Sequence, residues 1–105
     1  MIKKKQTKYT FYVYSILYRN KMIYVGHTND IVIRQKQHNY LYKKGNNKPL
    51  YNYLRQVVGF DQKIELIVIG VYESRVEAKR REMFIILTDY FDKKKLKQKV
   101  PSIGR

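Results

Sequence analysis

The spacing of hydrophobic residues changes along the chain, and each change marks a predicted element of secondary structure. Residues 11–18 are rich in aromatic and β-branched residues, which is typical of a strand, and a polar turn at 19–21 leads into a second strand over 22–27. Because the turn is short, the two strands are expected to pair as an antiparallel hairpin.

The next segment has helical spacing. N-cap residue types at 28–30 precede residues 31–39, which predict a first helix, and the polar residues 40–48 predict a loop. Pro49 suits the first turn of a second helix that ends at Gly59, with apolar residues at helical spacing at Leu50, Tyr53, Leu54 and Val57.

A third strand and a last helix complete the pattern. Residues 62–71 are rich in β-branched residues and predict the strand. Ser74 and Glu77 have the spacing of a capping box, which opens a helix that runs to about Tyr90. The core stripe of this helix is expected at Val76, Met83, Ile86 or Leu87, and Tyr90.

The predicted order, β-β-α-α-β-α, indicates an α/β protein of the α+β type: a small three-stranded antiparallel sheet flanked by helices. A chain of 105 residues favours one domain, and a hydrophobic fraction of 44% supports one packed core. We expect a basic N-terminal arm over residues 1–8 and a single domain over 9–105 that ends in a basic tail.

The composition excludes several classes of protein. The chain contains no Cys and only two His, which excludes a disulfide framework, a thiolate metal site and a multi-histidine zinc site. No apolar run approaches the ~18–20 residues that a membrane span requires, so we expect no membrane association and a cytoplasmic or nuclear location.

The charge points to a polyanionic partner. The chain has 23 Lys and Arg against 8 Asp and Glu, a formal net charge of +15, and nucleic acid is the partner that such an excess favours. For any single basic run, a solvated surface is the alternative. The runs are Lys3–Lys5, Lys43-Lys44, Lys79–Arg81, and Lys93–Lys95 with Lys97 and Lys99.

Two groups of polar residues on the predicted helices are candidates for chemistry. Arg34 and His38 are four residues apart and share a helix face, where they could bind a phosphate and move a proton; the alternative is a surface pair. Glu82 follows a basic run but has Ala78 as its i−4 neighbour, so it lies beside the core face. It could hold Mg²⁺ with water and phosphate oxygens, or form an ion pair with Lys79.

The hairpin supplies a third candidate. With a three-residue loop, paired residues have numbers that sum to 40, which places Tyr14 opposite Gly26 and puts Tyr24 on the same face as Tyr14. The glycine would then leave room for a bulky ligand beside the Tyr14 hydroxyl. A two-residue loop would put the tyrosines on opposite faces, and ordinary sheet packing is the alternative explanation.

Taken together, these residues resemble the GIY-YIG endonucleases over roughly residues 9–100. Tyr12-Val13-Tyr14 stands where the family has GIY, and Tyr24-Val25-Gly26 stands where it has YIG. Arg34 follows Tyr24 by ten residues, His38 follows Arg34 by four, and Glu82 follows an alanine by four, as in the family's helices.

The resemblance implies a one-metal mechanism in which the side chains have separate roles. Glu82 would bind a single Mg²⁺ or Mn²⁺, and Arg34 would neutralise the scissile phosphate. Tyr14 would position or deprotonate the attacking water beside Tyr24, with His38 as hydrogen-bond partner or proton relay. Because a tyrosine has a reference pKa of ~10, the metal or neighbouring cations of this basic protein would have to lower it.

Other residues are expected to contact the nucleic acid. Gly26 would allow close approach, His27 lies next to it, and Lys43 and Lys44 form one basic run. Lys97 stands where the family often has an asparagine and could contact a phosphate instead.

The leading hypothesis is therefore a metal-dependent DNA endonuclease. The alternatives are a non-catalytic basic nucleic-acid-binding module that keeps the nuclease fold, and a basic RNA-binding or ribosome-associated protein. A monomer with one site cuts one strand per event, so double-strand cleavage would need a homodimer or two encounters. Catalysis would require Tyr14, Tyr24, Arg34, His38 and Glu82 to converge on one concave face.

Overall fold

The central strand of the sheet is β1 (Phe11–Tyr18), which pairs antiparallel with β2 (Lys21–Thr28) on one side and β3 (Ile67–Tyr72) on the other. The computed structural model describes residues 10–59, 63–92 and 96–98. The expected arm over 1–8 and the basic residues 93–95 and 99 lie outside this part. The strand order β2-β1-β3 confirms the predicted three-stranded antiparallel sheet.

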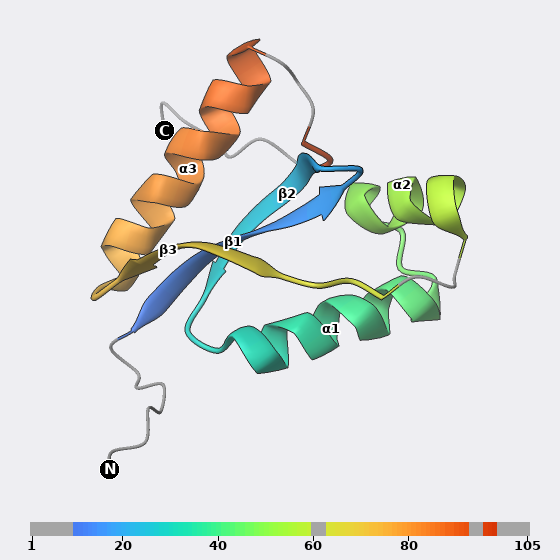
Figure 1. Cartoon of the computed structure of the whole chain (residues 1–105), viewed down its shortest axis with the longest axis horizontal. Helices are drawn as coiled ribbons and strands as arrows, with labels where there is room; N and C mark the ends of the chain where they lie inside the picture. The colour runs from blue at the N-terminus through green and yellow to red at the C-terminus, as the bar shows by residue number, and fades with distance from the viewer. Residues whose placement is uncertain (1–9, 60–62, 93–95, 99–105) are drawn as a thin grey trace.

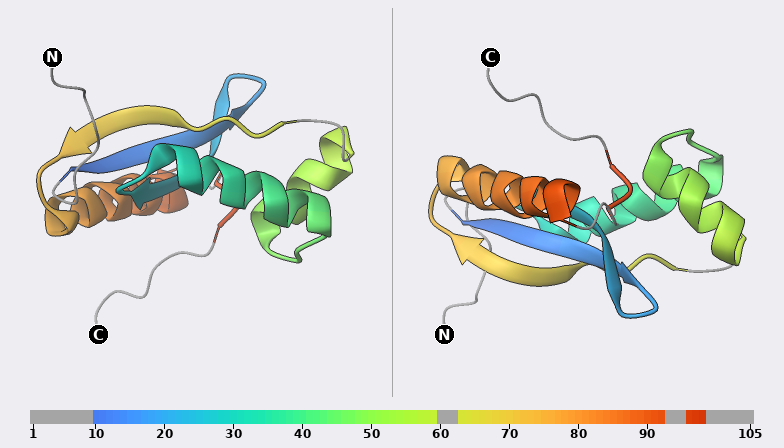
Figure 2. Two further views of the ribbon diagram at one scale, coloured as in Figure 1. Left: turned by 90° about the horizontal axis from the view of Figure 1, so that it is seen from below. Right: turned by 90° about the horizontal axis from the view of Figure 1, so that it is seen from above.

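The helices α1 (Ile31–Lys44) and α2 (Pro49–Val58) pack on one face of the sheet, and α3 (Arg75–Asp92) packs on the other (Figure 1). In Figure 2, α1 lies in front of the sheet in one view and α3 in the opposite view. This order of elements confirms the predicted β-β-α-α-β-α fold. None of the helices that the structure describes combines the length and apolar character needed to cross a bilayer.

Alternate residues of β1 separate the core into two clusters. Tyr14 and Ile16 point toward α1 and α2, where the buried residues are Ile23, Tyr42, Leu50, Tyr51, Leu54, Ile64 and Leu66. Val13 and Phe11 point toward α3 and pack with Val25, Ala78 and Ile86. The period of two along the central strand therefore decides which side chains meet which helix.

The hairpin has the predicted register, but its loop is shorter than predicted and one strand contains a bulge. Tyr18 pairs with Lys21, so the loop has two residues, Arg19 and Asn20, and both have positive φ (54° and 65°), as a type I′ turn requires. The expected three-residue loop is therefore wrong. The register shifts between Ile16 and Leu17, which leaves Ile23 as the extra residue of a β-bulge.

Because of this bulge, Tyr14 and Tyr24 lie on the same face of the sheet, as the sequence predicted. Ile16 pairs with Tyr24 and Tyr14 pairs with Gly26, so the numbers of paired residues sum to 40 beyond the bulge. The carbonyl oxygen of Ile23 accepts a hydrogen bond from the Lys97 backbone N–H at 2.7 Å. Tyr14 and Tyr24 consequently share one face.

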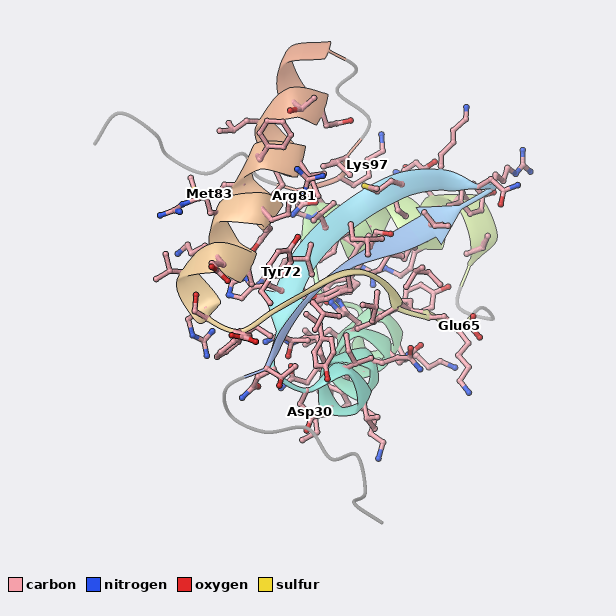
Figure 3. All side chains as sticks on the ribbon, turned by 60° about the vertical axis from the view of Figure 1, so that its left-hand side comes forward. Asp30, Glu65, Tyr72, Arg81, Met83 and Lys97 are labelled. Atoms are coloured by element: carbon pink, nitrogen blue, oxygen red, sulfur yellow. The ribbon has the colours of Figure 1, made fainter. Side chains whose placement is uncertain are left out.

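The polar caps of two helices agree with the sequence. Asp30 caps α1, with its Oδ1 accepting from the Ile33 N–H at 3.0 Å, and Ser74 Oγ accepts from the Glu77 N–H at 3.1 Å at the start of α3. Figure 3 shows Asp30 at the start of α1. The side-chain oxygens satisfy N–H groups that the first helical turn leaves unpaired.

Other boundaries differ from the prediction. The expected loop over 40–48 is helical to Lys44, because Tyr42 is fully buried and its hydroxyl donates to the Gly59 carbonyl at 2.5 Å. Strand β3 begins only at Ile67, since the N–H groups of Ile64 and Leu66 bond to side chains of α1 instead of to a strand.

The core stripe of α3 is also revised. Val76 is 62% exposed, so its predicted core position is wrong, whereas Ala78 and Ile86 are buried against the sheet. Met83 is half-buried, and the side chain of Tyr90 lies outside the part that the structure describes. The small Ala78 side chain lets the helix approach the strands closely.

The outer edge of β2 is covered by the segment that follows α3. The Gln98 side chain accepts a hydrogen bond from the Val25 N–H at 2.7 Å and donates one to the Val25 carbonyl at 2.8 Å. Lys97 lies beside β2 (Figure 3). An amide side chain thus completes the hydrogen bonding of an edge strand, as a neighbouring strand would.

Candidate active site

A chain of hydrogen bonds joins three elements on the α1 face of the sheet. The Tyr14 hydroxyl of β1 lies 2.8 Å from His38 Nε2 of α1, and His38 Nδ1 lies 2.8 Å from the Tyr51 hydroxyl of α2. Tyr14 is 0% exposed and His38 is 5% exposed. Burial makes these hydrogen bonds necessary, because an unpaired polar group in the core is costly.

Tyr24 and Arg34 extend this chain to the surface. The ring centroids of Tyr14 and Tyr24 are 6.2 Å apart, and each tyrosine shifts the pKa of the other. The Arg34 guanidinium is close enough to both tyrosines to lower their pKa values. Both Tyr24 and Arg34 are half-buried, so they connect the buried groups with solvent.

These side chains open into a cleft of about 930 Å³ between α1, α2 and the segment after α3. Its walls carry the functional groups described above and several amides and lysines. The lining residues are Tyr24, Arg34, Gln37, His38, Leu41, Asn46, Asn47, Lys48, Pro49, Leu50, Tyr51, Lys97 and Gln98. The cleft thus offers polar donors and positive charge to an anionic ligand.

His38 is uncharged in this setting. Burial, followed by the charges of Arg34 and Lys48, lowers its pKa from 6.5 to about 4. A neutral imidazole has one N–H and one lone pair, so one neighbouring tyrosine donates to it and the other accepts.

The hydrogen bonds of His38 therefore run in a single direction through Tyr14, His38 and Tyr51. Burial raises the pKa of Tyr51 to about 12, so its hydroxyl stays protonated.

Burial dominates the electrostatics of the two motif tyrosines. It raises the pKa of Tyr14 well above 10, with Tyr24 adding to the rise and Arg34 opposing it. Burial also raises the pKa of Tyr24, followed by the negative charge of Glu82, while Arg34 lowers it. Arg34 lowers both pKa values, as expected of a neighbouring cation, but desolvation is larger and the net shift is upward.

Gly26 is needed for a different reason than predicted. A Cβ at this position would lie 2.6 Å from the Tyr14 hydroxyl oxygen and 2.7 Å from its Cζ. The space beside the glycine is thus filled by the Tyr14 ring and does not provide room for a bulky ligand. A side chain here would displace Tyr14 from its hydrogen bonds.

Glu82 approaches this cluster from α3, on the opposite face of the sheet from Arg34. The expectation of a single shared face is wrong in this respect. The charge of Glu82 nevertheless raises the pKa of Tyr24. The two faces therefore interact electrostatically at the edge strand β2, which carries Tyr24. The side-chain partner of Glu82 is His27, with Nδ1 and Oε1 2.5 Å apart, and not Lys79.

The remaining predicted contact residues lie at different places. Lys43 and Lys44 are exposed in the last turn of α1. Lys97 lines the cleft, with its Nζ 4.7 Å from the centre of the Tyr53 ring. Only Lys97 of these three is therefore beside the hydrogen-bonded cluster.

Tyr51 is the site residue that the sequence reasoning missed. It lies three residues before Leu54 and one after Leu50, on the same buried face of α2. A tyrosine on a buried helix face needs a hydrogen-bond partner for its hydroxyl, so the position of Tyr51 in the sequence already indicated a polar neighbour. Its partner, His38, is 13 residues away in sequence, so only the folded chain identifies it.

The described residues contain no group of three or more His, Cys, Asp or Glu side chains that could hold a metal ion. A metal held by the described residues would therefore have few protein ligands, as Mg²⁺ often does. A family model described as GIY-YIG catalytic domain matches residues 10–96 of the chain. No curated protein and no solved structure matches it significantly.

Proposed function

Because the chain belongs to the GIY-YIG family of nuclease catalytic domains, we propose that it is a divalent-metal-dependent endonuclease that hydrolyses phosphodiester bonds in DNA. The observation that carries the proposal is the cluster of Tyr14, Tyr24, Arg34 and His38 at the wall of an open, basic cleft, with Tyr14 hydrogen-bonded to His38. Residues 9–105 would act as one catalytic domain.

Arg34 is proposed to neutralise the scissile phosphate. A guanidinium is permanently charged and has several donors that suit phosphate oxygens. Arg34 lines the cleft and its charge already acts on Tyr14 and Tyr24, so it is in place before a substrate arrives. A charge held in place costs little reorganisation when the pentacoordinate transition state forms.

Glu82 fits the role of the one protein ligand to a hard cation. Its side chain is 19% exposed, and His27 holds one of its oxygens. Mg²⁺ and Mn²⁺ accept such a site, because water and substrate phosphates complete the shell. When bound, a divalent cation supplies Lewis-acid stabilisation of the phosphate and offsets the negative charge that raises the pKa of Tyr24.

Tyr24 is proposed to be the group that contacts the attacking water. It lines the cleft, whereas Tyr14 has no exposed surface. The charge of Arg34 favours negative charge on the Tyr24 oxygen, and the hydroxyl of the neighbouring Tyr14 is held by His38. In this assignment the buried tyrosine and the neutral histidine orient and polarise Tyr24.

The test is cleavage of a supercoiled plasmid by the purified chain in Mg²⁺ or Mn²⁺ and in EDTA. We expect nicked circles before linear product, because one site cuts one strand per event. Arg34→Ala should reduce nicking by at least about 100-fold. Lys36→Ala is the matched control, since it removes the same charge from an exposed position of α1 outside the cleft.

One result would overturn the proposal. If the chain binds DNA but cuts neither strand with any divalent cation, it is a non-catalytic binding module. Competition between DNA and RNA of equal length would then decide between the two binding alternatives. Equal nicking by the two variants would remove Arg34 from the reaction.

A further inference from the structure

His27 directly follows the YIG-like segment and contacts the carboxylate that is proposed to hold the metal. It is contributed by β2, and its Nδ1 lies 2.5 Å from Glu82 Oε1 on α3. The two side chains are 18% and 19% exposed, so the contact is largely shielded from water. It joins residues 55 positions apart in sequence.

A second contact fixes which nitrogen of His27 carries the proton. Arg75 Nη1 lies 3.4 Å from His27 Nε2. A guanidinium has donors only, so Nε2 must accept, and the hydrogen is on Nδ1. The His27 imidazole therefore donates to Glu82 Oε1.

Arg75, which is exposed, also contacts the start of β1. Its Cζ lies 4.9 Å from the centre of the Phe11 ring, a cation–π contact at the start of β1. Contacts therefore connect Phe11 with Arg75, Arg75 with His27, and His27 with Glu82. The last of these groups is the carboxylate.

The same geometry argues against direct binding of a metal by His27. Coordination through Nδ1 would need a lone pair there, which moves the hydrogen to Nε2. That N–H would then face the Arg75 donor, and two donors would oppose each other. Coordination through Nε2 would place the cation beside the same guanidinium, whose positive charge opposes it.

We propose that His27 is a positioning residue, which holds the Glu82 carboxylate by an Nδ1–H···Oε1 hydrogen bond so that its other oxygen is presented to the divalent cation. The inference deepens the proposed function and rests on it for the role of Glu82. Losing such an outer hydrogen bond typically lowers metal affinity about 10–100-fold.

The first experiment needs no metal. Long-range ¹H–¹⁵N NMR spectra of the metal-free protein report the tautomer of each histidine, and the chain has only His27 and His38. The signals are assigned with a His27→Asn variant. We expect the Nδ1–H tautomer for His27, and an Nε2–H tautomer would overturn the proposal.

The second experiment measures Mn²⁺ binding by electron paramagnetic resonance in the absence of DNA. His27→Ala should weaken binding about 10–100-fold. His27→Asn should restore binding, because the asparagine amide can donate from the position of Nδ1. His27→Gln is the matched control: it carries the same amide on a longer side chain, so its donor lies beyond the Nδ1 position and binding should stay weak. Circular dichroism melts check that all three variants fold.

The outcomes separate this inference from the proposed function. Nitrogen hyperfine coupling to bound Mn²⁺ in the wild-type protein, or equal affinity of the alanine and wild-type proteins, would overturn the positioning role. If wild-type protein and Glu82→Gln fail equally to bind Mn²⁺, the metal role of Glu82 in the proposed function is wrong. The proposal about His27 as a positioning residue for a cation then falls with it, whatever the tautomer.

Discussion

Replacing Gly26 by alanine tests whether the glycine exists to seat Tyr14. The added Cβ would meet the Tyr14 hydroxyl oxygen at 2.6 Å and Cζ at 2.7 Å. Ordinary carbon contacts are about 3.5–4.0 Å, so the ring must move by about 1 Å. Tyr14 is fully buried and bonded to His38, so the movement disturbs both the packing and the hydrogen bond.

The cost follows from these two disturbances. Overpacking a core by one methyl group costs about 1–3 kcal/mol, and breaking a buried hydrogen bond costs about 1–3 kcal/mol more. We therefore expect Gly26→Ala to lower the free energy of unfolding by about 2–6 kcal/mol. Nicking should fall about 100-fold even where the variant is folded, because about 1 Å of displacement at a catalytic group has that effect.

Urea unfolding followed by circular dichroism and plasmid nicking under folded conditions measure both effects. Gly70→Ala on β3 is the matched control, since its Cβ would lie 2.7 Å from another tyrosine, Tyr72. Tyr72 is half-buried at an edge strand, on the α3 side of the sheet (Figure 3), and can turn away. We expect this control to cost about 1 kcal/mol or less and to leave nicking intact.

A Gly26→Ala variant as stable and as active as Gly70→Ala would refute this reasoning. Tyr14 would then not need its place beside the glycine, and its bond to His38 would not support the reaction. A variant that is destabilised but fully active when folded would separate the structural from the catalytic role of Tyr14 and would remove Tyr14 from the site.

Other predictions concern the metal, the cluster and the DNA. Glu82→Gln should keep the fold and DNA affinity but lose nicking by several orders of magnitude, whereas the exposed Glu77→Gln on the same helix should not; equal activity would exclude Glu82. Between about pH 6.5 and pH 4, His38 is protonated in the unfolded state but not in the folded state. The free energy of unfolding should therefore fall by up to about 3 kcal/mol as the pH is lowered through this range. Urea unfolding at several pH values measures this fall, and His38→Asn should make it smaller. Tyr51→Phe should cost about 1 kcal/mol in unfolding free energy and reduce nicking, and an unchanged rate would remove Tyr51 from the cluster. The slope of log K for DNA binding against log salt should be about −0.9 per phosphate contact, and a slope for only one or two contacts would contradict a basic binding surface.

Local signals in the sequence predicted the elements and part of the site. Strand β1 has the bounds that its aromatic and β-branched run predicts, and the caps at Asp30 and Ser74 form as expected. The pairing of Tyr14 with Gly26 was also predicted. These features depend on residues that are close in sequence, where propensity and spacing carry the information.

Two local features could not be predicted from the residues around them, because contacts with distant parts of the chain outweighed the local sequence preferences. The polar stretch after residue 39 stays helical through the packing of Tyr42, and the short type I′ turn gives the predicted register only because Ile23 bulges. The carbonyl of that bulged residue is bonded by Lys97, far along the chain. No propensity within the hairpin predicts such a partner.

The electrostatics of the site were decided by the tertiary structure alone. The sequence supplies Tyr14, His38, Arg34 and Glu82, but the sign of each pKa shift depends on burial and on which charges lie nearby. Desolvation outweighs Arg34 at Tyr14 because the ring is enclosed by residues from three elements. The contact of His27 with Glu82 across 55 residues arises in the same way, because strand and helix meet only after the chain has folded.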